Sequence, residues 1–354
     1  MAYYKLFFNN CVFTNDLYYY TMGVMRKEDS FSPISEKQLK DELNFEPVEK
    51  LGQNFLVDPA MVKAVASLTI EGADVVEIGC GPGNITKGIA KRASSVIGLE
   101  IFPDFAEAQE KILKGIDNVK IVNQNALNFD FKKWLNIDRE ARHQVIGNIP
   151  FNISEPLLTT LSVVSDKIER ITLLVGDNMA SIMTMRNPND DRYTRLSFIC
   201  GIFDVNRTVH VPRTSFWPVP RTDADVISLS PKEYPEDGKM YGFQLRKRII
   251  LSQKESLTLA KVLNGFSSGS EMGKQLRKDL SHRYERRQIN VELKRMAIDL
   301  NKLPVGHRSV NNELTGEIGT LVARIGLPME ILSKPFSRLN NEEVRQLAIA
   351  IGNL

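Results

Sequence analysis

Cysteine and histidine are scarce in this sequence, and it has no apolar run of membrane-spanning length. Its 354 residues include three cysteines and four histidines. The cysteines, Cys11, Cys80 and Cys200, are odd in number and widely spaced, which argues against a disulfide framework and against a zinc site. No apolar run could cross a bilayer. These absences exclude a disulfide-stapled scaffold, a zinc module and a membrane-embedded protein. They favour a reducing compartment, which we expect to be the cytoplasm, with the mitochondrion as the alternative.

The aromatic N-terminal stretch shows no targeting signal. Residues 1–31 lack the basic region and apolar core of a signal peptide, and also the Arg-rich, acid-poor bias of a transit peptide. We therefore expect residues 1–45 to form an extension in front of the first domain.

Positive charge is concentrated in one part of the chain. The net charge is +3, but residues 241–300 contain thirteen Lys and Arg against six Asp and Glu, so that window carries +7 and the rest carries −4. Such a segment predicts a surface that faces phosphates. The alternative is a solvated helical face without a partner.

Strand-like and helix-like runs alternate through the first two thirds of the sequence. This alternation predicts an α/β fold with a parallel sheet, whose ligands bind at the carboxyl ends of the strands. The expected strands are 74–81, 94–101, 119–126, 143–150 and 170–176, with helical runs at 84–93 and 103–116. Two later runs, 207–216 and 223–231, predict a closing antiparallel pair. Strand patterns almost disappear after residue 231, which places a domain boundary near residue 232.

A glycine-rich turn and an acidic residue indicate a nucleoside site. Gly79, Gly81 and Gly83 follow the first expected strand and precede a helix, so the backbone can approach a ligand closely. Glu100 ends the next strand, where a carboxylate can bind both hydroxyls of a ribose. The turn has neither dinucleotide G-x-G-x-x-G spacing nor a phosphate-binding lysine. A plain turn and a surface acid are the alternative interpretation.

Asn148-Ile149-Pro150-Phe151 follows the fourth expected strand, next to the predicted nucleoside. The Asn148 amide oxygen and the Ile149 carbonyl can each accept one N–H of an exocyclic amine on a base. Two such bonds favour a pyramidal nitrogen with a localised lone pair, which can attack a methyl group. Pro150 stiffens the turn, and Phe151 can stack on the flat base, a contact worth about 1–3 kcal/mol. An ordinary turn with a buried Phe is the alternative.

Several stretches in this order resemble the ribosomal RNA adenine N6,N6-dimethyltransferases of the KsgA type. The resemblance is close over residues 46–232. It rests on the stretches EKLGQNFLVDPAMV (49–62), EIGCGPG (77–83), LEI (99–101), NIPFNISEPLL (148–158), RYTRLSF (192–198) and FWPVPRTDADV (216–226). The stretch 327–351 resembles the family's short C-terminal helical domain, whereas residues 233–325 match only loosely.

The resemblance implies a fold, a cofactor and a reaction. It implies a Rossmann-like class I methyltransferase domain over 46–232 and a basic helical RNA-binding domain over 233–354. The implied reaction is direct transfer of two methyl groups from S-adenosyl-L-methionine to N6 of two adjacent adenines near the 3′ end of small-subunit rRNA, without a metal. Expected partners are rRNA in an assembling small subunit and no membrane, and the free protein is expected to be monomeric.

The same resemblance assigns roles to individual residues. The catalytic unit is Asn148, Ile149, Pro150 and Phe151. Cofactor contacts are expected from Gln53, Asn54, Leu56, Gly79, Gly81, Gly83, Glu100, Ile101, Asn125, Ala126 and Asn148. The RNA-binding residues are suggested by the basic clusters and not by the family motifs. They are Arg246, Lys247, Arg248, Arg277, Lys278, Arg286 and Arg287.

The chain departs from the family pattern at two places. Asn125 stands where the family usually has an Asp that accepts a hydrogen bond from the cofactor's adenine amine, which predicts weaker cofactor binding. Gly176-Asp177-Asn178 replaces a Gln-Lys-Glu cluster, so an acid stands in place of a cation. Two other functions therefore stay open: macrolide-resistance-type methylation of a large-subunit adenine, and a non-catalytic nucleic-acid-binding factor on the same scaffold.

Overall fold

The computed structural model describes residues 31–43, 45–48, 51–136, 140–232, 240–252, 257–259, 262 and 326–352. The described residues from Pro33 onward belong to one compact unit. Most of the predicted extension and most of the basic window lie outside these ranges, so the predicted domain boundaries stay predictions.

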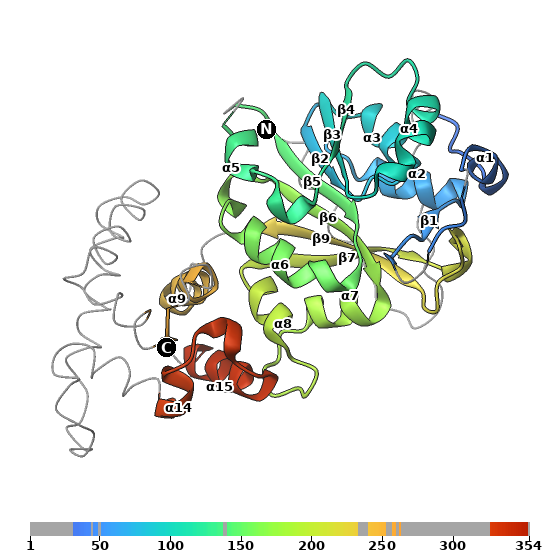
Figure 1. Cartoon of the computed structure of the whole chain (residues 1–354). Helices are drawn as coiled ribbons and strands as arrows, with labels where there is room; N and C mark the ends of the chain where they lie inside the picture. The colour runs from blue at the N-terminus through green and yellow to red at the C-terminus, as the bar shows by residue number, and fades with distance from the viewer. Residues whose placement is uncertain are drawn as a thin grey trace, which may run out of the picture. The chain divides into compact units, whose positions relative to one another are not determined.

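The core is a seven-stranded sheet in the order β4-β3-β2-β5-β6-β9-β7 (Figure 1). Its strands are β2 (Asp74–Ile78), β3 (Ser95–Glu100), β4 (Val119–Asn123), β5 (His143–Asn148), β6 (Arg170–Gly176), β7 (Phe203–Val211) and β9 (Ala224–Pro231). The first five are parallel, and β9 pairs antiparallel with both β6 and β7. This confirms the predicted α/β fold and the closing antiparallel pair. Strand order reverses at β2 and β5, which is where ligands bind in open α/β sheets.

Helices cover both faces of the sheet (Figure 1), and the two predicted at 84–93 and 103–116 are shorter than expected. They are α2 (Pro59–Ser67), α3 (Thr86–Ala90), α4 (Ala106–Ile112), α5 (Phe131–Trp134), α6 (Phe151–Ser162), α7 (Asp177–Thr184) and α8 (Arg195–Cys200). The run predicted at 103–116 begins as a 3₁₀ turn at Pro103–Phe105 and ends before Gly115, whose φ is +77°. A left-handed glycine of this kind commonly terminates a helix.

A small antiparallel ladder joins two distant parts of the chain beside the sheet. Strand β1 (Phe55–Leu56) pairs with β8 (Phe216–Trp217). The amides of Val57 and Asp58 both donate to the Ser215 carbonyl, at 2.9 and 3.1 Å. The opening stretch of the family resemblance and one of its late stretches are therefore neighbours in space.

The N-terminal helix α1 (Glu36–Glu42) packs into an apolar cluster of its own. Ser35 caps this helix through a capping box with Gln38. Leu39 is fully buried in the cluster, together with Phe55 and Phe105. Burial of this apolar face stabilises the helix at the edge of the sheet.

The C-terminal helices share the main apolar core. Helix α9 (Met240–Leu251) packs against α6 and α8, and α15 (Asn341–Gly352) packs against α8 and α9. Helix α14 (Met329–Leu332) contributes Ile331 and Leu332 to the same apolar cluster. The Phe336 ring lies 4.9 Å from the Phe198 ring, and the Arg246 guanidinium lies over Phe198 at 4.5 Å. Arg195 donates to the Ser337 carbonyl at 2.6 Å. The RYTRLSF stretch thus forms part of the surface that holds the C-terminal segment.

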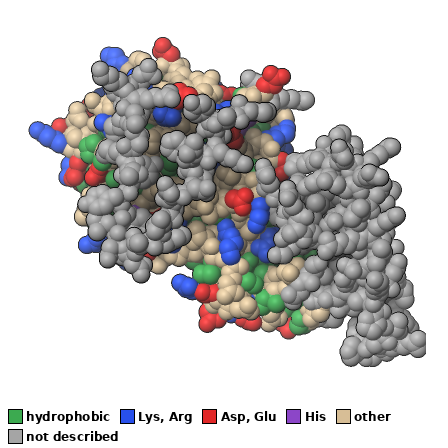
Figure 2. All heavy atoms as spheres, turned by 180° about the vertical axis from the view of Figure 1, so that it is seen from behind, with side chains coloured by type: hydrophobic (Ala, Val, Ile, Leu, Met, Phe, Trp, Pro, Cys, Tyr) green, Lys and Arg blue, Asp and Glu red, His purple; other side chains and the backbone are tan. Residues whose placement is uncertain are grey.

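The described surface mixes charges of both signs. Figure 2 shows basic and acidic side chains interspersed over one face, with a small group of Lys and Arg near its middle. Among the helices in the described ranges, none combines the length and apolarity needed to span a membrane.

Phe336→Ala should weaken the attachment of the C-terminal helices. Phe336 is fully buried, and removal of a buried Phe side chain costs about 3–5 kcal/mol. We expect a loss of that size in the free energy of unfolding, measured by urea denaturation. Ile349→Ala, at a position that is 37% exposed in the same segment, is the control and should cost far less. Equal losses in the two variants would contradict the packing role of Phe336.

Candidate active site

The carboxyl ends of β2 and β5 meet at the point where strand order reverses. Ile78 on β2 is paired with Gly147 on β5, so the glycine turn after β2 lies next to Asn148. A Cβ at position 147 would come within 2.8 Å of the Ile78 carbonyl, and one at position 79 would lie 3.4 Å from the Asn148 carbonyl. The two strand ends therefore approach each other closely, and glycine at position 147 is required for it.

The glycine turn and Glu100 are joined directly. Gly79, Gly81 and Gly83 all have positive φ, at +69°, +51° and +102°. The Gly81 amide donates to Glu100 Oε2 at 2.8 Å. Glu100 Oε1 accepts from the amides of Ile101 and Phe102 at 2.8 and 3.0 Å. Backbone donors on both sides thus hold this carboxyl in place at the end of β3.

A cavity of about 660 Å³ opens between these elements. Its size is in the range of small-molecule sites. Most of the predicted cofactor and catalytic residues line it: Gln53, Asn54, Gly79, Gly81, Glu100, Ile101, Asn125, Ala126, Asn148, Ile149 and Pro150. The structure therefore gathers residues from five separate segments of the chain around one space.

Three predicted site residues are not among the described residues that line this cavity. Leu56 is 1% exposed and belongs to the core beneath β1. Gly83 faces the Leu113 side chain, which a Cβ there would meet at 3.2 Å. Phe151 begins α6, and the position of its ring lies outside what the structure describes.

Sequence reasoning missed the aromatic wall of the cavity. Phe55, Phe102 and Phe105 also line it. Phe105 meets Phe55 edge-on with 5.5 Å between ring centroids, and Phe102 edge-on at 6.4 Å. Phe102 and Phe105 follow β3 directly. Their closeness to Glu100 in the sequence could therefore have identified them as lining residues. Phe55 comes from a segment that only the β1–β8 ladder brings here.

The amide of Asn148 has a defined orientation. Its Nδ2 donates to the Asn54 carbonyl at 2.9 Å, which leaves Oδ1 as the outward acceptor. No hydrogen bond to the Ile149 carbonyl is present among the described residues. Two neighbouring oxygens thus have no hydrogen-bond donor among the described residues, and their predicted role as acceptors for a ligand amine stays a prediction.

A second pocket, of about 300 Å³, lies on the other side of Asn148. It shares Gly52, Asn54, Asn148, Ile149 and Pro150 with the first cavity. Its remaining walls come from the end of β6, the start of α7, strand β8 and the loop before β9, including Gly176, Asn178, Phe216, Thr222 and Asp223. The Asn148–Pro150 turn therefore separates two spaces and has access to both.

Asp177, the acid in place of the family's cation, has a cationic partner. Its carboxylate pairs with Arg207 of β7 at 3.2 Å. Arg207 also pairs with the buried Asp225 at 3.1 Å and donates to Ser181 at 2.6 Å. His210 contacts Asp225 from the other side at 3.1 Å. This network ties the start of α7 to the β7–β9 pair at the edge of the second pocket.

The predicted RNA-binding residues that the structure describes already have partners in the protein. Arg246 stacks on Phe198 and donates to the Tyr193 hydroxyl and the Phe198 carbonyl. Lys247 pairs with Asp166 at 2.6 Å. Arg248 is half-buried on the same helix. Arg277, Lys278, Arg286 and Arg287 lie outside the described residues, so RNA binding by this set stays a prediction.

Other chemistry finds no support in the described part of the chain. Within it, no group of His, Cys, Asp and Glu is arranged to hold a metal ion. Cys80 and Cys200 are free and buried. Burial raises the pKa of Cys200 to about 12 and also raises that of Cys80, so both sulfurs are protonated thiols at neutral pH.

A second carboxyl, Glu77, is buried beneath the glycine turn. Glu77 is 3% exposed, and its Oε2 has no hydrogen-bond partner in the structure. Burial raises the pKa of Glu77 from 4.5 to about 8, the neighbouring Thr86 hydroxyl opposes that shift, and Glu100 adds to it. Glu77 is therefore largely protonated at neutral pH.

Glu77→Gln should flatten the pH dependence of stability. Between pH 4.5 and 8 the unfolded chain releases the Glu77 proton while the folded chain keeps it. The wild type then loses stability as pH rises through this window, by at most about 1.4 kcal/mol per pH unit. Gln cannot ionise, so the variant should lose less. Urea denaturation at several pH values measures this, and parallel curves for the two proteins would rule out a raised pKa.

Comparison with known proteins agrees with this geometry. Residues 44–288 match the model of the family described as ribosomal RNA adenine dimethylase. A ribosomal RNA small subunit methyltransferase A from Moorella thermoacetica is 32% identical over 234 residues, which cover 61% of this chain and 81% of the relative. The protein of the same name from Pediococcus pentosaceus is 29% identical over 226 residues, or 60% of this chain and 74% of the relative.

Among solved structures, a dimethyladenosine transferase from Plasmodium falciparum aligns over 83% of this chain and 96% of its own, with 20% identity and a TM-score of 0.47. The family match covers more than half of the chain and continues past residue 232 into the basic segment. The matched residues include the glycine turn, Glu100 and Asn148–Phe151. They also include the strands β2, β3 and β5, whose pairing brings these residues together. The chain belongs to the ribosomal RNA adenine dimethylase family.

Proposed function

We propose that this protein uses S-adenosyl-L-methionine to dimethylate N6 of two adjacent adenines near the 3′ end of small-subunit rRNA during ribosome assembly. The observation that carries the proposal is the position of Asn148 between two cavities, with its Oδ1 and the Ile149 carbonyl both available as acceptors. The larger cavity suits the cofactor and the smaller one suits the target adenine. The names of the bacterial relatives support the small subunit as the substrate.

The larger cavity fits S-adenosyl-L-methionine. Asn54 Oδ1 is buried without a hydrogen-bond partner, as expected of an atom that completes its bonding with a ligand. Glu100 has acceptor capacity left for ribose hydroxyls, and the aromatic wall suits an adenine ring. Asn125 Oδ1 accepts from the Leu127 amide at 2.9 Å and keeps a second lone pair for an adenine amine. When bound, this cofactor supplies an electrophilic methyl group.

The protein's contribution to the reaction is orientation and electrostatics. The adenine N6 amine presents two N–H groups, one for Asn148 Oδ1 and one for the Ile149 carbonyl. Two acceptors out of the base plane weaken conjugation of the nitrogen lone pair with the ring and direct that lone pair toward the first cavity. An adenine must leave its stack to enter such a pocket, so the target is unpaired or flipped out.

Asn148→Ala should lower methyl transfer by at least about 10²–10³-fold and largely preserve cofactor binding. The variant loses one of the two acceptors, and removal of one such electrostatic contact typically lowers kcat about 10²–10³-fold. Single-turnover transfer of labelled methyl groups and calorimetric cofactor binding measure the two properties.

Asn148→Asp is the matched control, because it keeps an acceptor of the same size but cannot donate to the Asn54 carbonyl. We expect it to retain more transfer activity than the Ala variant. Loss of cofactor binding together with transfer in Asn148→Ala would assign the residue a structural role.

Asn125→Asp should tighten cofactor binding about fivefold. A hydrogen bond to a charged acceptor contributes roughly 1 kcal/mol more than one to a neutral acceptor. Asn128→Asp makes the same chemical change at an exposed position outside the cavity and is the control. Titration calorimetry with the cofactor measures both. Equal affinity of the Asn125 variant and wild type would show that residue 125 does not contact the adenine amine.

The substrate test uses labelled S-adenosyl-L-methionine with undermethylated small and large ribosomal subunits in separate reactions. Dimethyladenosine in small-subunit RNA alone is the expected result. Label in the large subunit would favour the macrolide-resistance type. No label in either, with cofactor bound, would favour a non-catalytic binding factor.

A further inference from the structure

A third cavity, a basic cleft, lies at the opposite end of the strands from the candidate active site. It has a volume of about 620 Å³ and is lined by the amino-terminal ends of β5 and β6, the 3₁₀ turn Ser165–Lys167, the end of β9 and one side chain of α9. Strand β5 runs from His143 at this cleft to Asn148 at the active site. At about 3.3 Å per residue, the two sites are roughly 17 Å apart along the strand.

Cations outnumber acids among the residues that line the cleft. Five cations from four separate segments face it against two acids, which leaves a net charge of +3: Arg142, Lys167, Arg170, Lys232 and Lys247 against Asp166 and Glu169. Four of these five cations lie outside the predicted basic window, so charge counting along the sequence did not find them.

Both acids are paired within the cleft. Glu169 accepts two hydrogen bonds from Arg142, at 2.8 and 2.6 Å, and this pairing lowers the pKa of Glu169. Asp166 accepts from Lys247 at 2.6 Å. These pairs hold the two cations in fixed positions, and the other three cations form no ion pair with a described residue.

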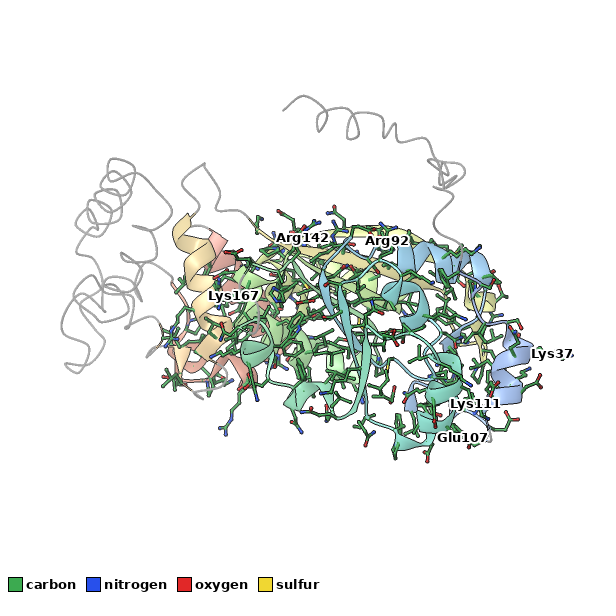
Figure 3. All side chains as sticks on the ribbon, turned by 90° about the horizontal axis from the view of Figure 1, so that it is seen from above. Lys37, Arg92, Glu107, Lys111, Arg142 and Lys167 are labelled. Carbon is green, nitrogen blue, oxygen red and sulfur yellow. The ribbon has the colours of Figure 1, made fainter. Side chains whose placement is uncertain are left out.

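The three remaining cations make hydrogen bonds only to neutral groups, or none. Lys167 donates to the Asn136 amide oxygen at 2.9 Å. Arg170 donates to the Leu68 carbonyl at 3.4 Å, and its charge also helps to lower the pKa of Glu169. The exposed Lys232 makes no side-chain hydrogen bond or ion pair with any described residue. Figure 3 shows Lys167 beside α9, at the end of the described body opposite to Lys37.

We propose that this cleft binds the phosphate backbone of a second rRNA segment, separate from the one that carries the target adenines. The proposal rests on rRNA being the substrate. The cations are spread around a wide cleft instead of converging on one point, which suits a row of phosphates better than a single anion. A target adenine in the second pocket leaves the cleft roughly 17 Å away, within reach of another part of a folded RNA.

Two linked sites give a folded ribosomal RNA an advantage over a short one. Once the target segment is bound, contact at the cleft becomes intramolecular, and affinity rises without any change at the active site. The cleft therefore selects large, folded RNA and leaves the chemical step unaffected.

The test is the double variant Lys167→Ala/Lys232→Ala, compared with Lys37→Ala/Lys114→Ala. Both variants remove two exposed or partly exposed lysines that have no acidic partner among the described residues. Each phosphate contact contributes roughly 0.7 to the salt dependence of binding to RNA, so the cleft variant should lose about 1.4 from the slope of log affinity against log salt. At 0.1 M salt this corresponds to a roughly 25-fold loss of affinity for protein-free small-subunit rRNA.

The control variant should match wild type with this RNA. Both variants should match wild type with a short hairpin that carries only the target adenines. For undermethylated small subunits, the cleft variant should show a raised KM and an unchanged kcat.

Equal slopes for the cleft variant and the control would overturn the proposal. Weaker binding to intact subunits with unchanged binding to protein-free rRNA would assign the cleft to an acidic ribosomal protein and also overturn it. Wild-type label on the large subunit alone would reject the proposed function. A reduced slope on small-subunit rRNA would still identify the cleft as an RNA site, so the two failures are distinguishable.

Discussion

The hydrogen bond from the Asn148 amide to the Asn54 carbonyl connects the sheet to the segment that closes both cavities. On one side, Asn148 is the last residue of β5, positioned by its parallel neighbours. On the other, the Asn54 segment is held by the β1–β8 ladder. Without this bond, the amide could rotate and present a donor where the proposed chemistry needs an acceptor. The orientation of the Asn148 amide that the proposed chemistry needs therefore depends on a contact between residues 94 positions apart in sequence.

Two buried carboxyls near the cofactor cavity differ because their surroundings differ. Glu100 accepts three backbone amides, which partly offset the cost of burying its charge. Glu77 lacks such donors, and its pKa of about 8 keeps it largely neutral under the glycine turn. In the proposed function, the first acid is the one that binds the ribose, and the other lies under the turn without adding a full negative charge.

Cations in this chain have two kinds of role that composition alone does not separate. Arg195, Arg207 and Arg246 each hold pieces of the protein together through carbonyls, carboxylates or a ring. Lys167 and Lys232 lie in a cleft and form no ion pair with any residue that the structure describes. Which role a cation has depends on whether folding brings an acceptor to it. A count along the sequence therefore highlighted a basic window and missed a basic cleft made of separate segments.

The order of strands and helices, the glycine turn, Glu100 and the Asn148 unit could all be identified from the sequence, because each depends on local patterns of neighbouring residues. Element ends were less accurate, since the glycines at 79 and 81 end β2 earlier than the apolar pattern suggests. Tertiary structure decided the rest. It placed Phe55 beside Phe105, gave Asp177 its partner Arg207 and placed Arg246 over the Phe198 ring. These contacts join residues far apart in the chain, and only the pairing of strands and the packing of helices bring their side chains within reach.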